Sequence, residues 1–247
     1  MLSLDAIKQL SISLGVYRPA RALHRLLTDQ TDYKDHKRLL SLFIRPGDLA
    51  FDVGANIGEK TDIMLSLGAR VVAFEPQPAL AREVRARGSR HSLTVVQSAV
   101  GAKIGSAELF LTTSTGMASL RPDWDHSAAR TTILASVTTL DAAIREYGKP
   151  VFCKIDVEGF EVDVLKGLST TLSALSFEYH CHAAAIVRVR DCVARLMNLG
   201  RYEFQLTGTE SGNFLLPEWL PPDVFLNAFP ACASPHYYGD IFARLSS

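Results

Sequence analysis

The residues Phe51–Gly58, with the sequence FDVGANIG, give the strongest indication of the fold of this chain. The apolar run Leu49–Val53 ends there in a glycine-rich turn, and a helical pattern follows from about Gly58 to Leu67. Gly54 allows the chain to turn sharply and leaves the backbone open to a ligand. Gly58 permits close packing of the following helix, whose N-terminal amides favour an anion. This order of strand, turn and helix predicts the start of a Rossmann-like domain.

A second apolar run, Arg70–Phe74, ends in Glu75 and Pro76. A carboxylate at the end of this strand can accept hydrogen bonds from the two hydroxyls of an adenosine ribose. Dinucleotide sites usually have the pattern G-x-G-x-x-G, whose middle glycine makes room for a pyrophosphate, and here Asn56 stands at that position. The pattern therefore favours S-adenosylmethionine, whose amino-acid tail needs a polar group such as Asp52. A dinucleotide-dependent oxidoreductase is the alternative.

Strands and helices alternate along the rest of the chain. Three further strands and three further helices are predicted at Leu93–Val96, Val151–Ile155 and Leu175–Tyr179, and at Pro78–Arg87, Phe160–Leu168 and Ala183–Leu199. Strands that are apolar on both faces and joined by helices call for a mostly parallel sheet covered by helices on both sides. The predicted fold class is therefore α/β, with a Rossmann-like domain over residues 46–247 and an N-terminal helical extension over residues 1–45.

Some segments fall outside this alternation. Glu108–Thr112 and Thr132–Val137 predict an inserted hairpin or sheet extension. The proline-rich stretch from Pro217 to Pro235 predicts a surface loop. Added strands at one edge of the sheet are predicted for Tyr202–Leu206, Asn213–Leu216 and Ile241–Leu245.

The composition narrows the classes of function. Of the 247 residues, 47% are hydrophobic, which suffices for the core of one main domain. Lys plus Arg equals Asp plus Glu at 26 each, so the chain lacks the positive excess of a general nucleic-acid binder. The four cysteines form no CxxC pair, which argues against a zinc site and a disulfide framework. With no signal-peptide core and no run of the ~18–20 apolar residues of a membrane span, we expect a cytoplasmic protein whose oligomeric state stays open.

The sequence resembles the FkbM family of methyltransferases over roughly residues 45–215. The most distinctive stretch is Lys154–Glu161, with the sequence KIDVEGFE. The other matching stretches are Asp52–Gly58, Phe74–Pro76, Thr138–Asp141 and Val164–Gly167. The resemblance implies a Rossmann-like sheet, S-adenosylmethionine as cofactor and, in many members, O-methylation of sugars or hydroxylated natural products. The expected partner is thus a small-molecule or saccharide acceptor.

The candidate catalytic residues follow the fourth and fifth strands of the predicted sheet. Asp156 is expected to position cofactor or substrate, and Glu158 to help bind the acceptor hydroxyl. The alternative is that both carboxylates cap the helix beginning near Phe160. His180 is the candidate general base. No metal ligand is assigned, although a divalent-metal site built by Glu178, His180 and His182 together with Asp156 is an alternative.

The remaining candidates surround the cofactor. Ser98 and Ala99 end the third strand, where the adenine would lie, and Thr61 would approach the methionine end. The full predicted set is Asp52, Gly54, Ala55, Asn56, Gly58, Thr61, Glu75, Pro76, Ser98 and Ala99. A non-catalytic protein that retains the fold is a further alternative, but it would be expected to have lost part of this set. Trp124 and Trp219 would either cover the substrate or simply pack.

Overall fold

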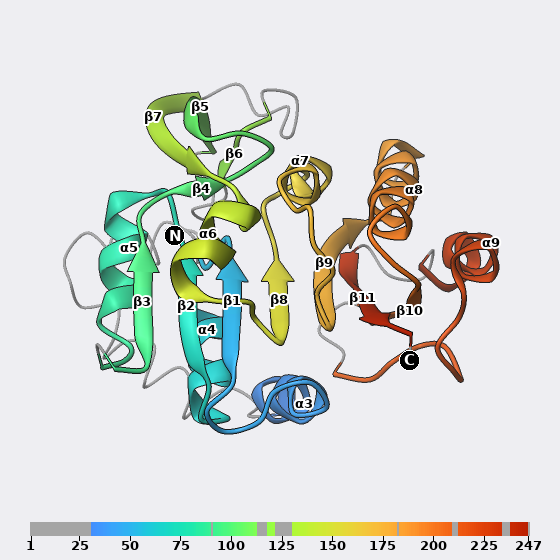
Figure 1. Ribbon diagram of the computed structural model, residues 1–247. Coiled ribbons are helices and arrows are strands. Elements are labelled where there is room, and N and C mark those ends of the chain that lie inside the picture. The colour runs from blue at the N-terminus through green and yellow to red at the C-terminus, as the bar shows by residue number, and fades with distance from the viewer. Residues whose placement is uncertain are drawn as a thin grey trace, which may run out of the picture.

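The computed structural model describes residues 31–89, 91–112, 118–121, 130–181, 183–208, 212–233 and 238–246. The helices predicted before residue 31, Trp124 and His182 lie outside these residues. Two layers of helices enclose a central sheet, and a smaller sheet lies across one end of it (Figure 1). The predicted α/β class with a mostly parallel sheet is confirmed.

The central sheet has seven strands in the order β10-β11-β9-β8-β1-β2-β3. Their bounds are β1 Leu49–Val53, β2 Arg70–Phe74, β3 Leu93–Val96, β8 Phe152–Ile155, β9 Ala174–His180, β10 Tyr202–Leu206 and β11 Tyr238–Leu245. Strands β3, β2, β1, β8 and β9 pair in parallel, whereas β11 runs antiparallel to both β9 and β10. The chain leaves β1 toward β2 on one side and returns through β8 on the other. The strand order therefore reverses between β1 and β8, where open α/β sheets bind their ligands.

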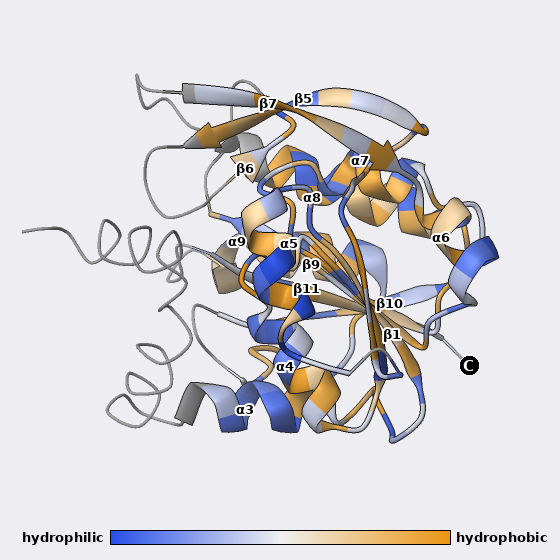
Figure 2. Cartoon of the chain, turned by 90° about the vertical axis from the view of Figure 1, so that its left-hand side faces the viewer, coloured by the Kyte–Doolittle hydropathy of each residue, from blue (hydrophilic) through white to orange (hydrophobic). Residues whose placement is uncertain are grey.

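Alternation along β1 explains the two helix layers. Phe51 and Val53 point to one face and Ala50 to the other, because successive side chains of a strand face opposite ways. The first face packs on the helices α6 Leu140–Tyr147, α7 Glu161–Lys166, α8 Ala183–Met197 and α9 Pro222–Ala233. The second packs on the helices α3 Thr31–Leu40, α4 Glu59–Ser66 and α5 Pro78–Arg85. Figure 2 shows the hydrophobic strands between these layers. Among the described residues, no helix combines the length and the apolar character that a membrane span requires.

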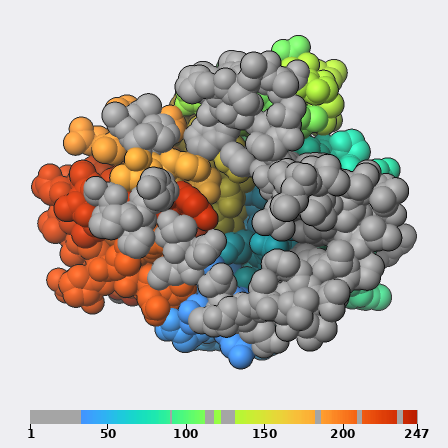
Figure 3. Space-filling view, turned by 180° about the vertical axis from the view of Figure 1, so that it is seen from behind, coloured from blue at the N-terminus to red at the C-terminus, as the bar shows by residue number. Residues whose placement is uncertain are grey.

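The described part of the predicted N-terminal extension is α3. Its Leu39 and Leu40 are buried in the core on the α4 side of the sheet. Arg38 donates hydrogen bonds to the carbonyl of Gly212, at 3.1 Å, and to the side chain of Asn213. The blue surface of α3 accordingly meets the orange surface of the C-terminal segment in Figure 3. The domain boundary at residues 45–46 stays a prediction, but α3 itself is part of the packed core.

A second, four-stranded sheet has the order β4-β7-β5-β6. Its strands are β4 Ala99–Val100, β5 Gly105–Thr112, β6 Ala118–Ser119 and β7 Arg130–Thr138. The antiparallel pairing of β5 with β7 confirms the predicted hairpin. Figure 1 shows this sheet lying across the end toward which β1 and β8 point, so it covers the carboxyl ends of the central strands.

The C-terminal region corrects two predictions. The proline-rich stretch is not a loop but contains the helix α9, which begins at Pro222, where a missing N–H costs nothing. Its Phe225 and Phe229 lie one turn apart and are buried, with Phe225 stacked on Phe204 of β10 at 5.2 Å between ring centroids. This periodic apolar face outweighs the proline content. The predicted strand Asn213–Leu216 is reduced to one isolated bridge.

Candidate functional site

A cavity of about 140 Å³ opens at the carboxyl ends of the central strands, beneath the small sheet. It lies at the reversal of strand order between β1 and β8. Eight of the predicted site residues line it: Gly54, Asn56, Glu75, Pro76, Ser98, Ala99, Asp156 and Glu158. The fold therefore brings the end of the glycine-rich turn, the acid after β2 and the acids after β8 to one cavity.

Glu75 joins the two turns that enter this cavity. It is buried, with 3% of its surface exposed. Its Oε2 accepts a hydrogen bond from the backbone N–H of Asn56, and its Oε1 accepts one from that of Gln77, both at 2.8 Å. Burial raises the pKa of Glu75 to about 7, against the lowering effect of these two amides. Each carboxylate oxygen can still accept a further hydrogen bond, which suits a pair of ribose hydroxyls.

The glycine-rich turn has three residues with left-handed backbone angles. These are Gly54, Asn56 and Gly58, with φ of 82°, 51° and 81°. The backbone N–H groups of Gly54 and Ala55 both donate to the carbonyl of Phe74 at 3.0 Å, which ties the turn to the end of β2. The Oδ1 atom of Asn56 is buried and has no hydrogen-bond partner among the described residues. The turn therefore contains a buried acceptor that no described residue satisfies.

Four predicted cofactor residues do not line the cavity in the described part of the chain: Asp52, Ala55, Gly58 and Thr61. The hydroxyl of Thr61 donates a hydrogen bond to Oδ2 of Asp52 at 2.5 Å, and both side chains are buried. Burial raises the pKa of Asp52. This pair connects β1 to α4 beneath the turn, so its direct contact with a cofactor stays a prediction.

The stretch that begins with Lys154 places a buried cation beside the cavity. Lys154 is 3% exposed, and its Nζ lies 2.8 Å from Oδ1 of Asp240 and 3.3 Å from Oδ2 of Asp156. Burial opposes its charge, yet Asp156 and Asp240 hold the pKa of Lys154 above its usual range. Asp156 therefore stands at the cavity wall with its carboxylate held by an ion pair.

The backbone after Asp156 is bent so that Glu158 reaches the cavity. Glu158 and Gly159 have φ of 54° and 89°, and the hydroxyl of Ser119 in β6 donates to the carbonyl of Glu158 at 2.8 Å. Where α7 begins, the carboxylate of Glu161 accepts a hydrogen bond from the backbone N–H of Gly159 at 3.0 Å. The role of Asp156 and Glu158 as helix caps stays an alternative prediction.

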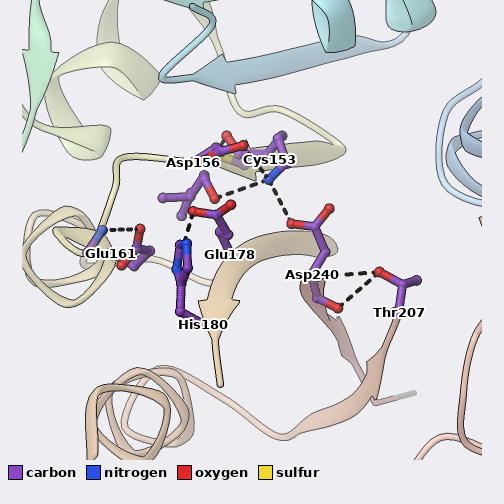
Figure 4. A network of polar contacts seen from close by, with 10 residues as sticks. Cys153, Asp156, Glu161, Glu178, His180, Thr207 and Asp240 are labelled. Carbon is purple, nitrogen blue, oxygen red and sulfur yellow. Dashed lines mark hydrogen bonds and ion pairs between the residues drawn. The ribbon is translucent and has the colours of Figure 1, made fainter. Parts of the chain in front are cut away.

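Three potential ligand groups gather at the ends of β8 and β9. We call Glu158, Glu178 and His180 the carboxylate–histidine cluster, because one oxygen or nitrogen of each lies within 4.8 Å of the others. Nδ1 of His180 is 3.8 Å from Oε2 of Glu178. Figure 4 shows that these two side chains point toward each other. Glu178 lines both the main cavity and a small adjoining one, and His180 lines the small one. Glu158 thus takes the place in this group that the sequence assigned to Asp156.

Comparison with known proteins decides the family. The methyltransferase FkbM domain matches residues 52–197. The chain belongs to this methyltransferase FkbM family. Two curated relatives are similar to it: the hexuronic acid methyltransferase AglP of Haloferax volcanii, 29% identical over 61% of this chain, and the 31-O-demethyl-FK506 methyltransferase FkbM of Streptomyces tacrolimicus, 38% identical over 38% of it. The matches span 62% and 37% of the length of these relatives.

Similarity to solved structures is lower. A cofactor-bound protein from MTB is 12% identical with a TM-score of 0.47, over 99% of this chain and 98% of that one. An O-methyltransferase from Bacillus cereus in complex with SAH is 14% identical with a TM-score of 0.44, over 89% and 82%. Such values are too low to support an inference about function.

The FkbM family implies S-adenosylmethionine as cofactor, and the residues of the cavity fit it. Glu75 offers carboxylate oxygens where a ribose would lie. Asn56 offers the buried acceptor Oδ1, which lacks a donor among the described residues and suits the ammonium of the methionine tail. A middle glycine for a pyrophosphate is absent, which favours the methyl donor over a dinucleotide.

Several residues of this FkbM-family site were not predicted. Among the residues that line the cavity are Gln77, Leu109 of β5, Ala118 of β6 and Leu120, which follows β6. Lys154 lies in a strand that is buried on both faces, and a buried lysine indicates that a carboxylate must pair with it. That carboxylate, Asp240, lies 86 residues further along the chain, so the sequence does not indicate which acid it would be. Of the two tryptophans, Trp219 packs against Phe43 and Phe214, with Arg244 4.5 Å above its ring. The packing interpretation holds for Trp219.

Proposed function

We propose that this protein transfers the methyl group of S-adenosylmethionine to a hydroxyl oxygen of a sugar or another small hydroxylated compound. The observation that carries the proposal is the arrangement of acids around one cavity. Glu75 stands at the end of β2, and Asp156, Glu158 and Glu178 stand at the ends of β8 and β9. One wall suits the ribose of the donor, and the other suits the hydroxyl of an acceptor.

When bound, the cofactor would supply an electrophilic methyl group on a sulfonium. The residues of the chain need only hold the acceptor oxygen in line with that methyl, since positioning alone can contribute ~7–11 kcal/mol. Glu75 and Asn56 would hold the donor, and Asp156, fixed by Lys154, would orient the donor or the acceptor. Glu158, Glu178 and His180 would lie on the acceptor side, where the hydroxyl proton is lost. Glu178 lines both cavities and His180 lines the small one, so Glu178 would connect His180 to the acceptor.

The names of the two relatives suggest the acceptor class. One relative is named for a hexuronic acid, which is a sugar derivative with hydroxyl groups, and the other for 31-O-demethyl-FK506, a name that marks an oxygen as the methylated atom. The formal net charge of zero gives no sign of a nucleic-acid acceptor. We therefore propose a saccharide or small-molecule acceptor.

Calorimetric titration with S-adenosylmethionine, S-adenosylhomocysteine and NAD(P)H tests the cofactor. We expect binding of the first two in the micromolar range, which is about −8 kcal/mol, and no binding of NAD(P)H. A screen of hexuronic acids, neutral sugars and hydroxylated natural products with a radiolabelled methyl donor then tests the acceptor. Tight binding of NAD(P)H in place of S-adenosylhomocysteine would refute the proposal.

Replacing Glu75 with alanine is expected to weaken S-adenosylhomocysteine binding by ~1–3 kcal/mol, because charge-assisted hydrogen bonds to the ribose are lost. Calorimetry measures the change in Kd. The matched control is Glu83→Ala on the neighbouring helix α5, which is not among the residues that line the cavity. If Glu75→Ala binds as tightly as the wild type, Glu75 does not hold the ribose.

Affinity for S-adenosylhomocysteine is expected to rise with pH. Ribose hydroxyls donate to the ionised carboxylate, and burial places the pKa of free Glu75 at about 7. Below that pH the carboxyl is protonated and must lose its proton on binding. Affinity should therefore increase about tenfold between pH 6 and 8 and then level off. The Glu75→Gln variant, measured in parallel, should lack this component, and an identical pH dependence in both proteins would contradict the assignment.

A further inference from the structure

The carboxylate–histidine cluster has the composition of a metal site. Two carboxylates and one imidazole converge from the loop after β8 and from the end of β9. Ligands about 2.0–2.2 Å from a common cation lie roughly 3–4 Å from one another. The distance of 3.8 Å between Nδ1 of His180 and Oε2 of Glu178 falls in this range, although it is too long for a hydrogen bond.

Glu178 supplies an independent sign of a missing partner. Its side chain is 14% exposed, and its Oε2 atom is buried and accepts no hydrogen bond within the described residues. A buried carboxylate oxygen without a donor is costly, so such an atom calls for an explanation. It is directed toward His180, inside the cluster (Figure 4). A cation between the two side chains would satisfy it.

The balance of charge near the cluster points the same way. Asp156, Glu158 and Glu178 all line the main cavity. The buried cation nearby, Lys154, is already shared by Asp156 and Asp240. A divalent cation would offset this concentration of negative charge.

We infer that Glu158, Glu178 and His180 bind a divalent metal ion of the Mn²⁺ type at the acceptor side of the cavity. Carboxylates suit Mg²⁺ and Mn²⁺, whereas imidazole suits the first-row metals, and Mn²⁺ accepts both. For catalysis this inference rests on the proposed function. The acceptor hydroxyl would bind the ion and lose its proton to water, because a bound divalent ion lowers the pKa of an oxygen ligand. Its lone pair would then form the O–CH₃ bond as the S–CH₃ bond breaks, leaving S-adenosylhomocysteine.

Binding of Mn²⁺ is tested without cofactor or acceptor. Protein without a histidine tag is treated with EDTA, desalted and titrated with MnCl₂, while electron paramagnetic resonance measures the free ion. We expect one site per chain. The Glu178→Gln variant should bind at least about tenfold more weakly. The control is Glu218→Gln, which changes an exposed carboxylate that is not part of the carboxylate–histidine cluster. This variant should bind Mn²⁺ like the wild type.

A spectroscopic measurement on the wild type guards against a variant that fails to fold. Electron spin echo modulation of bound Mn²⁺ should show a directly coordinated nitrogen, and His180→Gln should abolish that signal. Absence of a stoichiometric site, equal binding by Glu178→Gln, or a bound ion without nitrogen coupling would each overturn the inference. Titration of the same metal-free protein with S-adenosylhomocysteine tests the proposed function separately, since Glu75 and Asn56 need no metal.

Discussion

The Gly54→Ala variant is expected to lose more than about 4 kcal/mol of its free energy of unfolding, an exceptional cost for a single methyl group. A Cβ atom at this position would lie 1.7 Å from the backbone carbonyl oxygen of Asp156. That oxygen belongs to the chain leaving β8, the neighbour of β1 at the centre of the sheet. The clash can be relieved only by separating the two strand ends. Cofactor binding should be lost as well, because the same strand ends form the cavity.

Gly47→Ala is the matched control. Gly47 has the same left-handed φ, 88° against 82° for Gly54, but a Cβ atom there would meet nothing within 4 Å. It should therefore cost only the backbone strain of about 1–2 kcal/mol. Urea unfolding of both variants, followed by circular dichroism, gives the comparison. Equal losses in the two variants would show that the contact with Asp156 imposes no constraint.

The Lys154→Met variant is expected to lose about 3–5 kcal/mol, because it leaves the partly buried carboxylates of Asp156 and Asp240 without their main counter-charge. Methionine retains the length and the apolar contacts of lysine in β8 but cannot pair with Asp240. Asp240 is the more affected partner, since its side chain is 17% exposed, whereas that of Asp156 is 33% exposed and can be hydrated. Adding Asp240→Leu to the variant should recover part of the loss.

The pH dependence of this loss follows from Asp240. Burial alone would raise the pKa of Asp240, but Lys154 and Lys60 hold it below its usual value. In the wild type this carboxylate therefore contributes stability above its unfolded pKa of about 4, and the contribution is lost as the pH falls. Without Lys154 its pKa rises, so the folded variant loses stability as the pH increases. The difference between the two proteins should be largest near neutral pH and shrink toward pH 4.

Lys166→Met is the control for the loss of a lysine. Nζ of Lys166 lies 2.9 Å from Asp163, but its side chain is 54% exposed. An exposed ion pair is screened by water, so this variant should change stability by less than about 1 kcal/mol. Urea unfolding at pH 7 and pH 4 measures all these variants. If Lys154→Met is no less stable than Lys166→Met at pH 7, the buried pair does not contribute as proposed.

Much of the fold could be predicted because its signals are local. The strands Leu49–Val53, Arg70–Phe74 and Leu93–Val96 have their predicted bounds, since short apolar runs between turn residues are strand signals. The family resemblance read from KIDVEGFE is confirmed. The tail was predicted wrongly where two local signals conflicted. Its prolines indicated a loop, yet the spacing of Phe225 and Phe229 buries a helical face.

The strand–turn–helix unit, the acid after β2 and the acids after β8 could be predicted from the sequence, because each depends on neighbours within a few residues. Which charges meet depends instead on how distant parts of the chain pack together. β11 enters the sheet between β9 and β10, and this brings Asp240 to Lys154 from 86 residues away. In the same packing, Asp156 forms an ion pair with Lys154, whereas Glu158 lies close to Glu178 and His180. Strand order results from burial summed over the whole sheet, which no local pattern records.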